Sequence, residues 1–297
     1  MQSPNTAADP YVDSKLVKQL PGFTSHYRTV NDVRLHYILG GQGKPLVLLP
    51  GWPQTWWSYH KIMPLLADSY QVIVVELRGM GSSDKPMAGY SKKEMAGDVS
   101  ALLDQLSIKR TSIAGHDIGA AVAFSFAAHF PEKTEKLVLL DTPHPDENMY
   151  KLPMLPTGAG VHPWWVAFNQ VQHLPEQILE GRFHLVQDWL FDHLLEDKTA
   201  ISSFDRQVYA QAYKSQDAIR ASNGWYQTFS EDIADIEGKR IEAPTLGLAG
   251  PAGHQMLSYA LPPYINQLTL KEVVGAGHFV QEEKPHETSR FIRDFVN

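Results

Sequence analysis

The chain has 297 residues, of which 43% are hydrophobic and 20% are charged, with a net charge of −7 and no cysteine. These values are those of a soluble globular protein, and the lack of cysteine excludes disulfides, thiolate catalysis and zinc–thiolate sites. The acidic balance disfavours a nucleic-acid partner, because no basic stripe is available to pair with phosphates.

The first segment, residues 1–20, is polar and is predicted to be a flexible N-terminal tail. It lacks the apolar core of a signal peptide, and no apolar run along the chain approaches the length needed to span a membrane. We therefore expect a cytoplasmic protein that has no membrane partner. The sequence leaves the oligomeric state open, and a homodimer is one alternative.

The chain then alternates between apolar strands and helices. Residues 26–30 and 33–39 show period-two alternation and predict a β-hairpin. Short apolar runs predict strands, and runs with helical periodicity predict the helices between them. The predicted strands are 45–49, 71–77, 110–114, 136–140, 244–249 and 268–274, and the predicted helices are 56–68, 91–106, 120–129 and 284–296. Buried strands alternating with helices indicate an α/β fold, in which helices cover both faces of a parallel sheet.

One long segment, residues 143–235, interrupts this alternation. It is rich in Trp, His and Leu and shows no sheet-like strand. A helical insertion in a parallel sheet is typical of a cap over the carboxyl ends of the strands, where ligands bind in such sheets. We therefore predict a core of residues 21–142 and 236–297 and a helical cap of residues 143–235.

The pentapeptide Gly115-His116-Asp117-Ile118-Gly119 lies between a predicted strand and a predicted helix. It has the pattern of a nucleophile elbow, in which a nucleophile stands at the centre of five residues and small residues stand at both ends. Such an elbow is a sharp turn that exposes the central side chain. The central residue is Asp117, where a hydrolase with this pattern usually carries serine. A carboxylate attacks carbon and forms an ester, so the pattern favours cleavage of carbon–oxygen or carbon–halogen bonds.

Three further motifs accompany this elbow: Pro50-Gly51-Trp52-Pro53, the segment RGMGSSD at residues 78–84, and Gly275-Ala276-Gly277-His278-Phe279 followed by Glu282 and Pro285. In this set and order the chain resembles the α/β hydrolases over nearly its whole length. The resemblance is to their epoxide hydrolase and haloacid dehalogenase branch, with Cif-type and natural-product-tailoring bacterial epoxide hydrolases as the nearest patterns. It implies an α/β-hydrolase fold, with a mostly parallel central sheet flanked by helices and an inserted helical cap, and a hydrolase that needs no cofactor.

The resemblance also implies a catalytic triad. Asp117 is the implied nucleophile, and His278 is the implied base, since imidazole can take a proton from water near neutral pH. The acid that orients the histidine usually lies in the loop that corresponds to residues 250–254, which contains no carboxylate here. Asp141 is the alternative, because some bacterial epoxide hydrolases and fluoroacetate dehalogenases carry the acid after the preceding strand.

Further roles around the nucleophile follow from the same resemblance. The backbone N–H groups of Trp52 and Ile118 are the implied oxyanion donors. Tyr226 matches a cap tyrosine that protonates the epoxide oxygen, and Trp165 is expected to orient that oxygen through its indole N–H. The remaining substrate-binding candidates are Trp164, Phe168, Trp225 and His116. The alternative for four of the cap aromatics is that they only pack within the cap: Trp164, Trp165, Trp225 and Tyr226.

The predicted function is hydrolysis of an apolar or aromatic epoxide to a vicinal diol through an ester on Asp117. A dehalogenase that acts on haloacids or haloalkanes is the first alternative. Haloalkane dehalogenases carry Trp directly after the nucleophile, and fluoroacetate dehalogenases carry arginines where this chain has Ile118 and Ala121. A non-catalytic ligand-binding relative is the second alternative. No metal-binding, phosphate-loop or dinucleotide motif occurs, so we expect neither a metal nor a cofactor.

Overall fold

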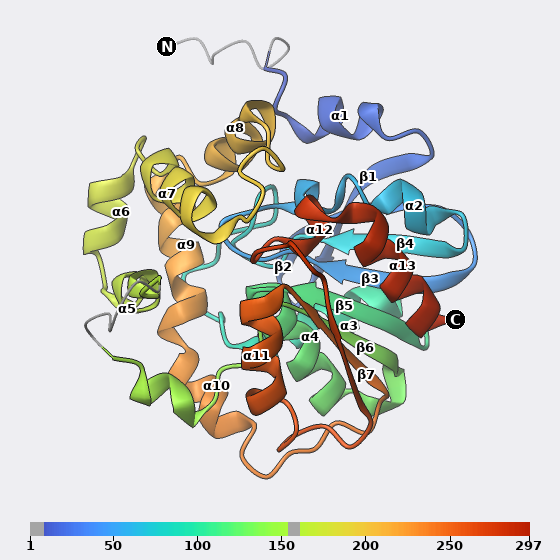
Figure 1. Cartoon of the computed structure of the whole chain (residues 1–297). Helices are drawn as coiled ribbons and strands as arrows, with labels where there is room; N and C mark the ends of the chain where they lie inside the picture. Colours follow the sequence, from blue (N-terminus) through green and yellow to red (C-terminus); the bar gives the residue numbers. More distant parts are fainter. Residues whose placement is uncertain (1–8, 154–160) are drawn as a thin grey trace.

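An eight-stranded sheet runs through the centre of the protein in the computed structural model, which describes residues 9–153 and 161–297 (Figure 1). The spatial order is β1-β2-β4-β3-β5-β6-β7-β8. The strands are β1 (Phe23–Val30), β2 (Val33–Gly40), β3 (Lys44–Leu49), β4 (Tyr70–Val75), β5 (Thr111–His116), β6 (Thr134–Leu140), β7 (Thr245–Ala249) and β8 (Leu268–Glu272). Strand β2 pairs antiparallel with β1 and β4, and the other neighbours are parallel. The predicted α/β fold is confirmed.

Helices cover both faces of the sheet because successive residues of its buried strands point to opposite sides. In β3, Val47 and Leu49 join the apolar core on one face, whereas Leu46 and Leu48 join the core on the other. The first core includes residues of α3 (Lys92–Gln105), α4 (Ile118–His129) and α11 (Pro251–Ala260), and the second includes residues of α2 (Met63–Ala67) and α13 (Pro285–Val296). The short helix α12 (Val280–Glu283) precedes α13.

The helix that we predicted over residues 56–68 is broken in two. A 3₁₀ turn at Trp56–Tyr59 is followed by the separate helix α2, in which Pro64 lies in the first turn. Proline has no backbone N–H, and its ring clashes with the carbonyl group four residues earlier in a continuous helix. The periodic segment therefore forms two short helical pieces instead of the single predicted helix, because Pro64 prevents a continuous helix.

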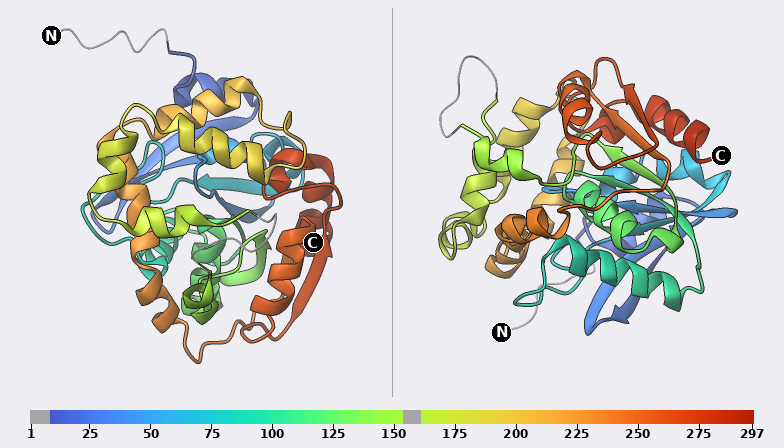
Figure 2. Two further views of the ribbon diagram at one scale, coloured as in Figure 1. Left: turned by 60° about the vertical axis from the view of Figure 1, so that its left-hand side comes forward. Right: turned by 90° about the horizontal axis from the view of Figure 1, so that it is seen from below.

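A helical insertion separates β6 from β7, as predicted. After a 3₁₀ turn at Glu147–Lys151 it contains α5 (Trp164–Gln170), α6 (Leu174–Leu179), α7 (His184–Leu194), α8 (Ser203–Ala212), α9 (Gln216–Gln227) and α10 (Phe229–Asp235). These helices gather at one side of the sheet (Figure 2). The domain limits given above remain a prediction.

A buried ion pair joins this insertion to the core. The Lys92 ammonium group lies 2.7 Å from an oxygen of Asp232, and both side chains are inaccessible to solvent. Lys92 also donates to the carbonyl oxygen of Trp225 and to Thr228, at the end of α9. An unpaired charge would be costly at this depth, so the pair fixes the end of α9 against α3.

The prediction of a flexible tail is wrong for residues 9–20, the part of the tail that the structure describes. Residues Asp13–Leu16 form the short helix α1, and Leu16 and Leu20 are buried in the core. Asp13 accepts hydrogen bonds from the Trp56 indole N–H and from the Ser82 hydroxyl group. The polar composition of this segment led to the wrong prediction, because it gave no sign that two leucines are buried and that one carboxylate is hydrogen-bonded. Residues 1–8 lie outside the described part.

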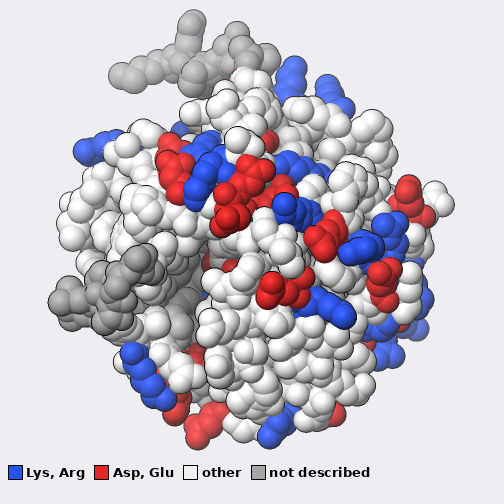
Figure 3. Space-filling model, viewed as in Figure 1, with Lys and Arg blue, Asp and Glu red and all other residues white. Residues whose placement is uncertain are grey.

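The surface carries both signs of charge. Lys and Arg side chains are interspersed with Asp and Glu on the face shown in Figure 3 rather than gathered in one basic patch. Among the described residues, no helix is both long enough and apolar enough to span a bilayer.

Candidate active site

Asp117 lies at the turn between β5 and α4, with φ +52° and ψ −122°. A positive φ is strained for a residue with a side chain, and such strain is concentrated at functional turns. The flanking glycines are needed for space. A Cβ atom on Gly115 would lie 2.1 Å from the carbonyl oxygen of Gly119, and one on Gly119 would lie 2.1 Å from that of Leu49. The turn therefore holds the Asp117 carboxylate at the end of β5, where the elbow motif predicted it.

His278 and Asp141 meet Asp117 at this end of the sheet. The Nδ1 atom of His278 lies 2.6 Å from an Asp141 carboxylate oxygen, and its Nε2 atom lies 3.7 Å from Asp117 Oδ2. The other Asp141 oxygen accepts from the backbone N–H of Gly250. Gly253 leaves room for it, because a Cβ atom there would lie 2.1 Å from Asp141 Oδ1. The loop that lacks a carboxylate thus surrounds the carboxylate supplied by β6.

The charges of these three side chains depend on one another. Burial opposes ionisation of Asp117, but the contact with His278 and its charge hold the pKa of Asp117 below its ordinary value. Burial also disfavours charged His278, yet Asp117 and Asp141 together raise the pKa of His278 to about 10. Burial raises the pKa of Asp141, against the opposing effect of His278. The lowered pKa of Asp117 and the raised pKa of His278 favour an Asp117 carboxylate beside a protonated imidazole.

Raising the pH is expected to lower the free energy of unfolding through His278. Its pKa is 6.5 ordinarily and about 10 in the folded protein. A raised folded-state pKa stabilises the protein fully below pH 6.5, and this stabilisation is lost as the pH rises through about 10. Urea unfolding of the native protein and of His278→Gln across this range measures the difference. Parallel stability curves would show that His278 is not protonated in the resting site.

Two backbone N–H groups face the Asp117 carboxylate. The N–H of Trp52 donates to Asp117 Oδ1 over 2.8 Å, and the N–H of Ile118 also lowers the pKa of Asp117. The approach is close: a Cβ atom on Gly51 would lie 2.3 Å from the Asp117 Cβ atom. Both predicted oxyanion donors are therefore next to the carboxylate, in position to stabilise charge that develops on Oδ1.

A cavity of about 500 Å³ opens from Asp117 between the insertion and α11. Among the predicted residues, Ile118, Trp165, Tyr226 and His278 line it with Asp117. Most of the other described lining residues are apolar or aromatic: Ala121, Pro143, Met149, Leu152, Val166, Leu194, Phe229, Met256 and Tyr259. No lysine or arginine is among the described lining residues. A neutral and largely apolar ligand of more than one ring suits this volume and lining.

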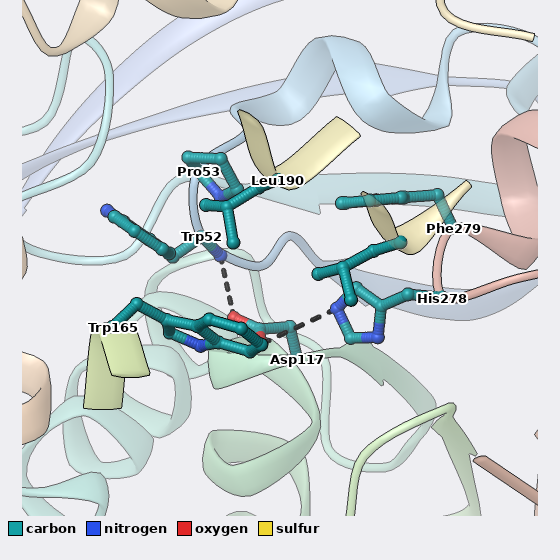
Figure 4. Close-up of a pocket in the computed structure, with 8 residues that line it drawn as sticks. Trp52, Pro53, Asp117, Trp165, Leu190, His278 and Phe279 are labelled. Carbon is teal, nitrogen blue, oxygen red and sulfur yellow. Dashed lines mark hydrogen bonds and ion pairs between the residues drawn. The ribbon is translucent and has the colours of Figure 1, made fainter. Parts of the chain in front are cut away.

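Tyr226 and Trp165 both line the large cavity. The Tyr226 hydroxyl group is buried and has no hydrogen-bond partner among the residues described, and burial raises the pKa of this phenol well above its ordinary value. Trp165 also lines a smaller pocket with Trp52 and Phe279 (Figure 4). The preference for Trp165 over Trp164 as the site-facing residue agrees with this geometry.

Four residues that we predicted to bind substrate do not line either cavity. Trp225 is fully buried, and its indole N–H donates to the carbonyl oxygen of Arg78. His116 lies behind the site, with its Nε2 atom 2.9 Å from the carbonyl oxygen of His278. Trp164 packs against Trp189 and Phe168. Neighbouring residues on a helix point about 100° apart, so Trp164 and Trp225 face away from the cavity that Trp165 and Tyr226 line.

Glu283 is a residue that the sequence analysis missed. One of its carboxylate oxygens accepts from the backbone N–H groups of Gly277 and Phe279, on either side of His278. The other accepts from the backbone N–H groups of Glu196 and Asp197, just after α7 of the insertion. A carboxylate soon after His278 could have been predicted to contact the His278 loop. The sequence could not distinguish Glu283 from the adjacent Glu282, which is also a carboxylate.

The chain is similar to known proteins along most of its length. Residues 44–285 match the family model described as alpha/beta hydrolase fold. A soluble epoxide hydrolase of Corynebacterium sp. (strain C12) is 30% identical over 283 residues, which cover 88% of this chain and 93% of that protein. A cis-3-alkyl-4-alkyloxetan-2-one decarboxylase of Shewanella oneidensis is 37% identical, covering 92% and 88%. A fluoroacetate dehalogenase of Burkholderia sp. is 28% identical, covering 93% and 94%.

Solved structures show the same fold. Wild-type Cfl2 from Burkholderia cenocepacia superposes with a TM-score of 0.82 at 31% identity, covering 93% of this chain and 96% of that one. The Cif epoxide hydrolase from Acinetobacter nosocomialis superposes with a TM-score of 0.86 at 20% identity, covering 100% and 99%, which supports the fold alone.

Proposed function

The chain belongs to the alpha/beta hydrolase fold family, in its epoxide hydrolase and dehalogenase branch, and from this premise we propose that it hydrolyses an apolar or aromatic epoxide to a vicinal diol. The observation that carries the proposal is the Tyr226 phenol, which lines the same cavity as the Asp117 carboxylate and has no hydrogen-bond partner among the described residues. An epoxide oxygen leaves as a strongly basic alkoxide and needs a proton donor there, whereas a halide does not.

In the first step, an Asp117 oxygen attacks an epoxide carbon. The carbon–oxygen bond of the ring breaks, and the departing oxygen takes the Tyr226 proton, while the Trp165 indole N–H donates a hydrogen bond to it. The products are a glycol ester on Asp117 and a tyrosinate. Held side by side in a buried site, the reacting groups need little further ordering.

In the second step, water attacks the ester carbonyl carbon while His278 takes a proton from it. The N–H groups of Trp52 and Ile118 stabilise the resulting oxyanion. Collapse releases the glycol, which takes the His278 proton, and the new Asp117 carboxyl proton returns to Tyr226. Ester formation removes one of the two carboxylate charges that raise the pKa of His278, so the imidazolium releases its proton to solvent and can act as a base. It takes up a proton again when the Asp117 carboxylate is restored.

The cavity lining argues against a haloacid as substrate. Ile118 and Ala121 both line the cavity, at the positions where fluoroacetate dehalogenases carry arginines. A haloacid carboxylate would thus enter an apolar site without a cation to pair with, which is unfavourable. A non-catalytic binding role is also disfavoured, since a binding protein needs no strained Asp117 next to an oriented imidazole.

A second candidate is decarboxylation of an oxetan-2-one, because the relative with that activity is 37% identical to this chain over the aligned residues. Such a lactone is also a strained oxygen ring that a carboxylate can open. Release of carbon dioxide with an alkene, rather than a diol, would identify this reaction.

The experiment that tests the proposal is a single turnover in heavy-oxygen water with a panel of aryl epoxides, haloalkanes, haloacids and oxetan-2-ones. We expect the diol of the first turnover to carry no label, because one of its oxygens comes from the epoxide and the other from Asp117. Label in the first diol would mean direct attack by water. Halide release, or carbon dioxide and alkene, without any diol would reject the epoxide hydrolase function.

Replacing Glu283 with glutamine is expected to slow ester hydrolysis about tenfold and to leave ester formation nearly unchanged. The amide keeps one acceptor but turns an N–H group toward backbone donors, which displaces the His278 loop. Rapid-quench measurement separates the two steps. Asp205→Asn is the control, because this carboxylate in the first turn of α8 accepts from the Ser202 backbone N–H and the Trp57 indole N–H and not from the His278 loop. Equal slowing of both steps in Glu283→Gln would contradict a role in positioning His278.

A further inference from the structure

His144 is a buried histidine that the proposed chemistry does not use. It follows β6 in the segment that begins with Asp141, is only 4% exposed, and lines the cavity of about 500 Å³ together with Asp117. Its ring packs against Phe124, with the ring centroids 5.0 Å apart. A buried polar ring requires a hydrogen-bonding partner for each of its nitrogens.

The protonation of this ring is set by its neighbour in the chain. Nδ1 lies 2.8 Å from the carbonyl oxygen of Pro145. A carbonyl oxygen can only accept, so Nδ1 carries the hydrogen and donates it. Burial lowers the pKa of His144 to about 4, so the ring is neutral at physiological pH. The remaining nitrogen, Nε2, is therefore a bare acceptor.

This acceptor belongs to a ring that lines the cavity. Nε2 makes no hydrogen bond within residues 9–153 and 161–297. The neighbouring carboxylate does not compete, since both oxygens of Asp146 accept from Asn148. The cavity thus offers an oriented neutral acceptor in a lining that is mainly apolar.

We propose that Nε2 of His144 is a specificity-determining acceptor that binds a hydroxyl group of the epoxide substrate. This inference rests on the proposed function and narrows it to epoxides that carry a hydroxyl group away from the oxirane. A hydroxyl group can donate a hydrogen bond to this nitrogen. An ether oxygen at the same place has no hydrogen to donate, and its lone pairs repel the lone pair of the nitrogen. A site built to bind a hydroxyl group discriminates strongly against the analogue that lacks it.

Binding of unreactive ligands tests this inference independently of turnover. The probes are naphthyl ethane-1,2-diols that carry either a hydroxyl or a methoxy group at each ring position in turn, titrated into the native protein by calorimetry. We expect at least one hydroxyl compound to bind about 10- to 100-fold more tightly than its methoxy partner. Equal affinities at every position, or no binding by any probe, would overturn the inference. A protein that shows the preference but opens no epoxide would instead reject the proposed function alone.

Two variants separate recognition from support of the loop. In His144→Asn the amide takes the place of Nδ1, so it keeps the bond to Pro145 but removes the acceptor, and the hydroxyl preference should fall toward one. In His144→Gln the amide oxygen can reach the place of Nε2, and part of the preference should return. A native-sized preference in folded His144→Asn would overturn the inference.

Discussion

Replacing His278 with glutamine is expected to trap a covalent ester on Asp117. Glutamine cannot take a proton from water, so the second step should slow by about 10²- to 10⁴-fold, whereas attack by Asp117 does not use the imidazole as a base. Intact-protein mass spectrometry after incubation with aryl epoxides should show a gain equal to one whole epoxide. Steady-state diol formation should fall by the same factor.

The control for this experiment is the double variant Asp117→Asn with His278→Gln, which should gain no mass. Digestion of the trapped single variant should place the added mass on the peptide that contains Asp117. A gain equal to a substrate minus its hydrogen halide would identify a dehalogenase. Full activity of His278→Gln would contradict the assignment of His278 as the base.

Replacing Tyr226 with phenylalanine is expected to slow epoxide opening by about 10²- to 10⁴-fold, the range for loss of a positioned general acid. The ring remains in place against Trp52, whose centroid lies 5.7 Å away, so packing changes little. Loss of the proton donor forces the alkoxide to leave unprotonated. Single-turnover alkylation rates for native protein and variant measure the effect directly.

A series of aryl epoxides sharpens this test. Electron-withdrawing substituents make the departing oxygen less basic and should reduce the penalty of the Tyr226→Phe change. Trp165→Phe is the matched aromatic control: it removes a hydrogen bond but no acid, so its effect should be smaller and nearly constant across the series. Equal losses in the two variants would contradict the assignment of Tyr226 as the acid.

The core of the site was predictable because local sequence encodes it. The glycines at 115 and 119 leave room for one sharp turn. The carboxyl ends of parallel strands meet at one edge of a sheet, and there the resemblance to α/β hydrolases implied that Asp117, Asp141 and His278 come together. The absence of a carboxylate in residues 250–254 pointed to Asp141, and Gly253 provides the space for it.

The cap residues were harder to predict because composition does not give the direction of a side chain. Trp164 and Trp165 are adjacent and chemically identical, yet only Trp165 lines the cavity. Trp225 is as apolar as any ligand-binding tryptophan, but the packing of α9 buries it against Arg78. The phase of each cap helix depends on contacts between segments distant in sequence.

The sequence by itself therefore determined the fold and the aspartate elbow. It also determined that Asp141 and His278 follow strands whose carboxyl ends lie at the edge of the sheet where Asp117 lies, because these features rest on local turn geometry or on strand order. Only the tertiary structure decided which aromatic rings line the cavity and which carboxylate holds the His278 loop. It also left the Nε2 atom of His144 bare, since the Pro145 carbonyl oxygen fixes the hydrogen on Nδ1 and the surrounding apolar residues keep the ring neutral.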